Sequence, residues 1–123
     1  GIFTTGADGG FSFVSVKPGA YPVPDDGPNG VLLHAQKRHN WRPAHLHFTI
    51  TARGYERLAT QVFRQGDPYL DADAVFGVRS SLVADWVRHE PGRTPDGQTS
   101  SAPFTILDFV FVLNNDITGD TTP

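Results

Sequence analysis

The sequence predicts an all-β fold, specifically a β-sandwich whose short strands are joined by long ordered loops. The chain has 123 residues, a length that suits a single domain. Its ten prolines and thirteen glycines interrupt it every few residues and disfavour long helices. Between these breaks, short runs of residues alternate between apolar and polar side chains, which is the period of a half-buried strand. Several such strands separated by long turns are typical of a sandwich.

The first predicted element is a hairpin. Residues 10–16 alternate apolar and small polar side chains, and the Asp8-Gly9 pair before them is typical of a hairpin turn. Residues 1–5 form the other arm in this interpretation. Residues 18–28 contain too many prolines for a central strand, because each proline removes a donor from the ladder. We expect this stretch to be an ordered loop or an extended segment.

The middle of the chain predicts two strands around a turn. Residues 41–51 form the first, and residues 58–63 form the second after the turn candidate Arg53-Gly54-Tyr55. Two further clusters, Gly66-Asp67-Pro68 and Asp71-Ala72-Asp73, mark the loop that follows.

The last third of the chain contains the strongest strand pattern, at residues 104–113. Residues 81–89 fit either a strand or a short helix, and we favour a strand. Residues 91–103 read as a polar loop between these two segments. We expect residues 1–114 to make up the sandwich and residues 115–123 to be a flexible tail.

The composition excludes several classes of function. Ten Lys and Arg residues against thirteen Asp and Glu residues give a formal net charge of −3, whereas nucleic acids and anionic membranes require a basic face. No apolar stretch approaches the roughly 20 residues of a transmembrane helix, and no signal peptide is visible. The absence of cysteine excludes a disulfide framework, a thiolate zinc site and a cysteine nucleophile. We expect a cytoplasmic protein that binds neither nucleic acid nor membrane.

The His45-Leu46-His47 triplet is the first candidate for chemistry. Residues i and i+2 of a strand point to the same face, so both imidazoles can reach one metal ion while Leu46 points into the core. The alternative is that both histidines are polar residues on a solvated strand face.

Three neighbouring residues favour the metal interpretation. Pro43 stiffens the entry to the strand. Tyr21 lies in a proline-rich segment and has no obvious packing partner nearby in the sequence. Arg42 lies close to the histidines, and its alternative role is an ion pair with Asp25 or Asp26.

Three blocks, in order along the chain, carry a resemblance to a known family: residues 21–28 (YPVPDDGP), 38–48 (RHNWRPAHLHF) and 66–76 (GDPYLDADAVF). The Arg-Pro-Ala-His-x-His string, preceded by the Tyr-Pro-Val-Pro block, is highly specific. In these blocks, and over about residues 1–114, the sequence resembles the intradiol ring-cleavage dioxygenases. Within that family it is most similar to hydroxyquinol 1,2-dioxygenases and catechol 1,2-dioxygenases.

The resemblance implies a β-sandwich of the intradiol dioxygenase type with a non-haem Fe(III) cofactor. The family holds its iron with two tyrosinates and two histidines, and by resemblance Tyr21 is the second tyrosine while His45 and His47 are the histidine pair. Phenolate is a hard anionic ligand that favours ferric iron, and imidazole suits iron in general.

The resemblance also implies a reaction. Dioxygen cleaves the carbon–carbon bond between the two hydroxyls of a catechol-type diol, which gives a muconate-type dicarboxylic acid. Tyr21 is expected to take up a substrate proton as a general base, Arg42 to neutralise negative charge on the ring, and Gln61 to lie beside the ring and the arginine. The small side chains of Ala74 and Val75 favour hydroxyquinol over catechol, because they leave room for a third hydroxyl.

Five residues are expected to line the substrate pocket, namely Pro22, Val23, Arg42, Ala74 and Val75. Other polar or aromatic residues are expected to have structural roles. The surface or hydrogen-bonded histidines are His34, His39 and His89, the turn-capping acids are Asp71 and Asp73, and the packing tyrosines are Tyr55 and Tyr69.

The chain departs from the family pattern at its start. No position matches the first tyrosine ligand, and the N-terminal helical region and first strands of the family have no counterpart. Together with a sequence that begins at Gly1 and contains no methionine, this predicts a fragment or a processed product. Because missing strands would leave sheet edges exposed, we expect self-association or association with the missing N-terminal part.

Two other functions remain open from the sequence. The first is a non-catalytic β-sandwich that binds metal or an aromatic ligand, or an inactive fragment of the enzyme. The second is a cupin-type metal enzyme, since cupins also use His-x-His on a strand. Cupins place a glutamate shortly after the pair, where this chain has Thr51, Ala52 and Arg53.

Overall fold

The computed structural model describes residues 2–117, which form nine short strands, one α-helix and two 3-10 turns. Two compact units are formed, one from residues 1–17 and 87–106 and the other from residues 18–86 and 107–123. Strands dominate the regular structure, as the sequence predicts.

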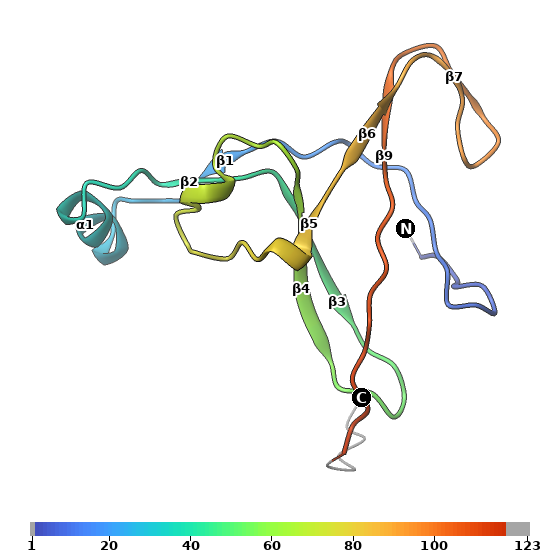
Figure 1. The fold of residues 1–123 in the computed structure, drawn as a ribbon, viewed down its shortest axis with the longest axis horizontal. Helices are drawn as coiled ribbons and strands as arrows, with labels where there is room; N and C mark the ends of the chain where they lie inside the picture. The colour runs from blue at the N-terminus through green and yellow to red at the C-terminus, as the bar shows by residue number, and fades with distance from the viewer. Residues whose placement is uncertain (1, 118–123) are drawn as a thin grey trace. The chain divides into compact units, whose positions relative to one another are not determined.

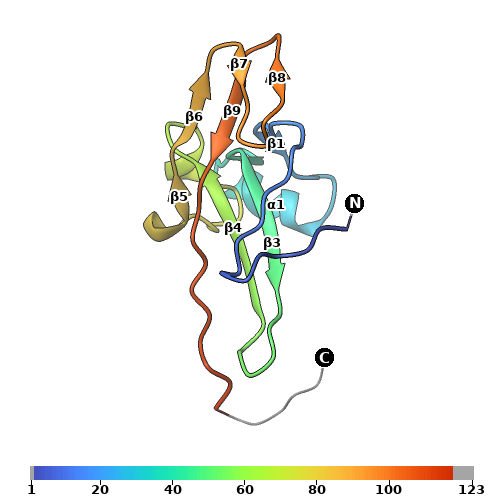
Figure 2. The ribbon, with the colours of Figure 1, turned by 90° about the vertical axis from the view of Figure 1, so that its right-hand side faces the viewer.

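The second unit is built on an antiparallel hairpin of β3 (His45–Ile50) and β4 (Leu58–Arg64). Both views show the two strands side by side (Figures 1 and 2). The register pairs His45 with Phe63 and His47 with Gln61. β5 (Val83–Ala84) adds to β4 in parallel. The turn between β3 and β4 uses Gly54 at φ 81°, a left-handed conformation that glycine adopts without steric cost.

A second strand pair brings two distant segments together. β1 (Tyr21–Pro22) and β2 (Trp41–Arg42) pair in antiparallel fashion, with Tyr21 opposite Arg42. The chain between them contains α1 (Pro28–Ala35), which begins with proline, a residue suited to the first helical turn. At Gly30 a Cβ atom would lie 1.7 Å from the backbone oxygen of Asp25, so only glycine allows the chain to fold back this tightly.

The core of the second unit is small and lies against the β3–β4 hairpin. Val62 and Phe63 of β4 are completely buried, and so is Ala44, which precedes β3. Complete burial of a side chain such as Phe63 contributes about 1.5–3 kcal/mol. Two 3-10 turns, η1 (Leu70–Ala72) and η2 (Ser80–Leu82), belong to the segment that returns from β4 to β5.

The first unit contains two small two-stranded sheets. One pairs β6 (Trp86–His89) with β9 (Phe104–Leu107). The other is a hairpin of β7 (Gly92–Arg93) and β8 (Thr99–Ser100). The segment 91–103, predicted as a polar loop, therefore carries a short hairpin.

Several predicted strands are shorter than the sequence pattern indicates. The pattern over 104–113 gives a strand only to Leu107, so the prediction for 108–113 is wrong. There Phe109 and Phe111 pack against one another with ring centroids 4.9 Å apart, and Phe111 also lies 4.8 Å from Phe48. An apolar run identifies side chains that need burial, but a strand also requires a neighbouring strand to pair with.

Other differences have local causes. The predicted turn at Asp8-Gly9 forms, with Gly6 N donating to Gly10 O at 2.8 Å. Its flanking arms within residues 2–16 adopt no strand, so the predicted hairpin is wrong. The strand predicted over 41–51 is broken between β2 and β3, where Pro43 has no N–H to donate.

At the C-terminus, the described part of the predicted tail is anchored. Asp116 N donates to Gly54 O at 3.0 Å, and Tyr55 forms a β-bridge with Asn115. Residues 118–123 lie outside the described residues. Across residues 2–117, no helix has the length and apolar character needed to cross a bilayer.

Candidate metal centre

The buried imidazole of His45 is held in one orientation at the start of β3. Its residue is only 6% exposed, and its Nδ1 lies 2.7 Å from the carbonyl oxygen of Pro43. Because a carbonyl oxygen can only accept, Nδ1 carries the proton and Nε2 presents its lone pair to the site. This is the arrangement by which proteins orient an imidazole towards a metal ion.

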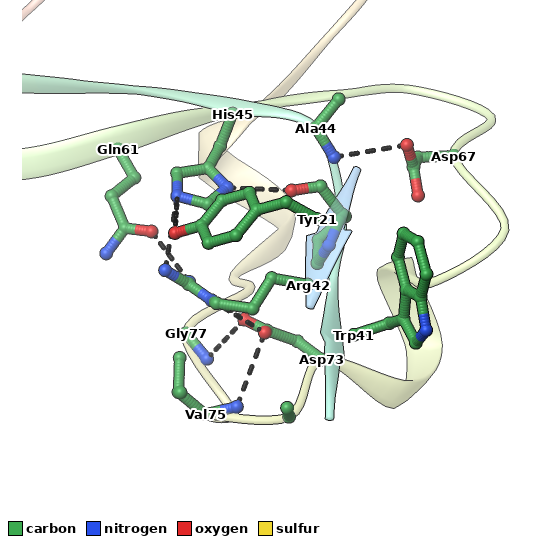
Figure 3. Close-up of polar contacts among 12 residues, drawn as sticks. Tyr21, Trp41, Arg42, Ala44, His45, Gln61, Asp67, Asp73, Val75 and Gly77 are labelled. Carbon is green, nitrogen blue, oxygen red and sulfur yellow. Dashed lines mark hydrogen bonds and ion pairs between the residues drawn. The ribbon is translucent and has the colours of Figure 1, made fainter. Parts of the chain in front are cut away.

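Two further donor atoms lie close to this nitrogen. The phenol oxygen of Tyr21 lies 3.5 Å from His45 Nε2, and His47 Nε2 lies 3.2 Å from it. Figure 3 shows the Tyr21 ring beside the His45 ring, with centroids 5.5 Å apart. The structure thus brings together the two histidines on one face of β3 and the tyrosine from β1.

Arg42 is the second feature of the centre and is only 5% exposed. Its Nη1 donates to His45 Nε2 at 3.1 Å, and its Nη2 donates to Gln61 Oε1 at 2.8 Å. The other edge of the guanidinium forms a two-pronged ion pair with Asp73, with Nε to Oδ1 at 2.9 Å and Nη2 to Oδ2 at 3.1 Å. Arg42 therefore connects the imidazole, the glutamine and a buried carboxylate.

The alternative partners considered for Arg42 are wrong. Neither Asp25 nor Asp26 pairs with it, and Asp25 instead lies 3.4 Å from His34. The true partner, Asp73, lies 31 residues further along the chain, so sequence proximity to Arg42 could not identify it. The capping role predicted for Asp73 is confirmed, because its carboxylate accepts from the backbone N–H groups of Val75 and Gly77.

The electrostatics follow from burial and from this pairing. Burial lowers the pKa of Arg42, but the hydrogen bonds and charge of Asp73 outweigh it and leave that pKa above its ordinary value. Burial raises the pKa of Asp73, and the donors Arg42, Gly77 and Val75 more than reverse this, so the carboxylate stays ionised. Burial, together with the nearby positive charge of Arg42, lowers the pKa of His45. A neutral imidazole is the form that binds a metal ion.

Asp67 was not singled out by sequence reasoning as part of the site, yet it fixes the entry to β3. It is only 5% exposed, and its two oxygens accept from the backbone N–H groups of Ala44 at 3.1 Å and Tyr69 at 3.0 Å. Figure 3 shows its contact with Ala44, the residue before His45. The Gly-Asp-Pro turn signal was the available clue, since aspartate in turns commonly accepts from nearby backbone N–H groups.

A cavity of about 550 Å³ lies beside α1 and the segment that follows η1. Three of the five predicted pocket residues line it, namely Val23, Ala74 and Val75. Pro22 and Arg42 are not among its lining residues. Arg42 instead faces the converging donors.

Three of the residues predicted to have structural roles make contacts of that kind, namely His39, His89 and Tyr69. His39 Nδ1 accepts from Trp41 N at 3.0 Å, and His89 stacks on Phe104 with ring planes 12° apart. Tyr69 stacks on Trp41 with centroids 5.3 Å apart.

The donor set fits a mononuclear iron ion. It offers two imidazole nitrogens and one phenol oxygen, and nitrogen and oxygen donors of this kind suit iron. Across the residues described, no cluster of three or more His, Cys, Asp or Glu side chains is placed to hold a metal ion. The third donor here is a tyrosine, which lies outside those residue types. A cation bound at His45 Nε2 would replace Arg42 Nη1 as the partner of that lone pair.

The fold and the site define a β-rich protein with a candidate mononuclear centre of nitrogen and oxygen donors. The sequence model of a family described as Dioxygenase matches residues 1–114. The chain belongs to this family, the intradiol ring-cleavage dioxygenases, as the sequence predicts.

Individual members of this family are similar to the chain. The chain is 56% identical to the 6-chlorohydroxyquinol 1,2-dioxygenase of Cupriavidus pinatubonensis over 93% of its length, and 47% identical to the hydroxyquinol 1,2-dioxygenase of a Rhizobium species over 92%. The crystal structure of hydroxyquinol 1,2-dioxygenase from Pseudomonas putida DLL-E4 superposes with a TM-score of 0.71, at 44% identity over 81% of the chain. The chain spans 37%, 39% and 35% of these three proteins, respectively.

Proposed function

We propose that the protein cleaves a catechol-type aromatic diol between its two hydroxylated carbons, using dioxygen and a non-haem ferric centre. The observation that carries the proposal is the convergence of Tyr21, His45 and His47 donors beside a buried arginine. Membership of the intradiol family supplies the reaction class.

In this proposal Tyr21, His45 and His47 hold the iron. Ferric iron bound there would act as a Lewis acid and as a template that orients the diol. The imidazole of His45 is already oriented by Pro43, so binding does not require it to reorient. His47 and Tyr21 are exposed, and their donors are accessible from solvent.

The protein side chains handle protons and charge. Tyr21 accepts a proton from a diol hydroxyl as the general base. Arg42 is fixed by Asp73 and Gln61, and its Nη1 is the guanidinium nitrogen that faces the donors. A cation held in this way neutralises negative charge on the ring without reorganising during the reaction.

The proposed substrate is hydroxyquinol, with catechol as the second choice. Ala74 and Val75 have small side chains and line the cavity next to α1, which leaves room for a third hydroxyl group. Two of the similar proteins carry the name hydroxyquinol 1,2-dioxygenase. The product in either case is a muconate-type dicarboxylic acid.

We also propose the organisation around this site. Residues 1–114 form the catalytic β-sandwich. In this proposal a second tyrosinate joins Tyr21, His45 and His47, as the family resemblance implies, and it is supplied by an associated chain or by an N-terminal part. Association of this kind, whether as a homo-oligomer or with that N-terminal part, covers the sheet edges.

An iron assay combined with a visible spectrum tests the function. The purified protein is expected to contain ferric iron, to show the red-brown phenolate charge-transfer band, and to consume dioxygen faster with hydroxyquinol than with catechol. A resorcinol control, in which the two hydroxyls are not adjacent, should give no uptake. Bound iron without uptake on either diol would favour a non-catalytic binding module, and an iron-free, colourless protein would contradict the enzyme.

A further inference from the structure

The loop at residues 73–77 is attached to the candidate centre by one carboxylate. Asp73 is only 3% exposed, and its two oxygens receive four hydrogen bonds. Two come from Arg42, at 2.9 and 3.1 Å, and two come from the backbone N–H groups of Val75 at 3.3 Å and Gly77 at 2.9 Å. Figure 3 shows these contacts on the side of Arg42 that faces away from His45.

This pairing determines which nitrogen of Arg42 enters the site. Asp73 occupies Nε and Nη2, and Gln61 takes a second bond from Nη2. Nη1 is left to face His45 Nε2 at 3.1 Å. Because the guanidinium is a rigid planar fork, holding one edge fixes the position of the other edge.

The packing around the pair leaves no room for adjustment. A Cβ atom at Gly77 would lie 2.9 Å from Arg42 Nη2 and 3.2 Å from Asp73 Oδ2. Any side chain there would therefore push against the ion pair. The close approach of the Gly77 backbone is what allows the loop to close over Arg42.

A second arginine holds the same loop from another side. Arg38 Nη2 donates to the carbonyl oxygen of Asp73 at 2.9 Å, and its guanidinium lies 3.8 Å from the ring centroid of Phe76. Phe76 has a positive φ of 54°, a conformation that a bulky residue adopts only where its surroundings impose it. The loop is thus held in one conformation, and it carries the pocket-lining residues Ala74 and Val75.

We propose that Asp73 is a positioning residue that couples Arg42 to the pocket-lining loop. The carboxylate fixes the position of Arg42 Nη1 relative to Ala74 and Val75. The guanidinium that neutralises the charge of the diol therefore stays at a constant distance from the two side chains that contact its ring. This role rests on the proposed function, because it concerns how the same site binds its diol. Asp73 itself acts through Arg42 and through the loop backbone.

Comparing Asp73→Asn with Asp71→Asn separates the positioning role from the loss of one negative charge, because both variants lose that charge. An amide has one acceptor oxygen where the carboxylate has two, and its NH₂ group would face donors. Asp71→Asn is the matched control, because it makes the same change at an exposed position two residues away. Gly77→Ala is the second variant, because it changes no charge and presses on the pair directly.

The experiment titrates hydroxyquinol and catechol into the complete iron-loaded protein without oxygen, following the visible band, so that it measures binding and not turnover. Asp73→Asn is expected to keep its iron and to bind both diols about tenfold more weakly, since a displacement near 1 Å at such a site can cost up to about a hundredfold. Gly77→Ala is expected to weaken binding severalfold and to change the ratio of the two affinities. Asp71→Asn should match the wild type.

The outcomes distinguish the two proposals. A wild-type protein that takes up no iron, or whose band does not respond to a diol, defeats the proposed function and the positioning role with it. A responsive wild type with an unchanged affinity in Asp73→Asn overturns the positioning role alone, even if that variant melts at a lower temperature. Should Asp73→Asn fail to fold, Gly77→Ala decides, and an unchanged diol affinity in that variant overturns the role.

Discussion

The candidate centre has two sides that differ in how the fold holds them. On the inner side, His45, Arg42 and Asp73 are between 3% and 6% exposed and are joined in a continuous hydrogen-bonded chain. On the outer side, His47 and Tyr21 are exposed, and Tyr21 retains 43% of its accessible surface. The inner side chains are held by many contacts, whereas the outer pair is placed by strand pairing and by single contacts with His45.

This difference separates two requirements of a metal site. Burial and hydrogen bonding orient the inner groups. Removing their charges from water costs desolvation free energy, which is offset only when every buried charge is paired. The exposed donors incur little desolvation, and a bound ion can complete their arrangement. We therefore expect substitutions on the inner side to change stability even without metal, and substitutions on the outer side to act mainly through the metal.

Arg42→Ala is the variant with the largest expected effect on this comparison. It leaves the buried carboxylate of Asp73 without its cation, and removing one partner of a buried ion pair costs about 3–5 kcal/mol. The measurement is the free energy of unfolding in urea for the metal-free protein. Arg88→Ala is the control, because its pair with Glu90 at 3.4 Å is largely exposed and should be worth less than about 1 kcal/mol. Equal losses of unfolding free energy in the two variants would contradict the interpretation that Arg42 stabilises a buried ion pair.

The sequence could predict the parts of the site that are local in the chain. His45 and His47 share a strand face because the side-chain period of a strand is two, and the Tyr-Pro-Val-Pro block identified Tyr21 through resemblance to a family. The partner of Arg42 could not be predicted in this way. Asp73 lies in a turn far along the sequence, and its capping signal does not reveal which cation the fold brings to it.

The fold was predictable to a similar extent. The β3–β4 hairpin has both alternation and a turn signal, and it forms where expected. Residues 109–113 are all apolar, a stronger burial signal, yet they form no strand. Pairing depends on what lies alongside a segment, and a sequence pattern contains no information on that.

His45→Ala and His47→Ala form the second test, since both remove an imidazole from the same strand face. In the metal-free protein, His45→Ala is expected to cost about 1–3 kcal/mol, because it deletes a buried group bonded to Pro43. His47→Ala should change stability by less than about 0.5 kcal/mol, as is usual for an exposed residue. Iron content, measured in parallel, should fall in both variants. Comparable losses of stability would remove the distinction between the two sides.

Tyr21→Phe has the smallest expected effect on stability and the most specific effect on the metal. The substitution removes only a phenol oxygen from a side chain that is largely exposed, so the unfolding free energy of the metal-free protein should change by less than about 0.5 kcal/mol. The phenolate charge-transfer band should be lost or shifted, because the proposed ligand atom is gone. Tyr55→Phe is the matched control, since Tyr55 is 45% exposed and lies outside the site. If both variants kept the wild-type spectrum, the outer side would contribute no phenolate to the metal, and the visible band would have to come from a tyrosine elsewhere in the protein.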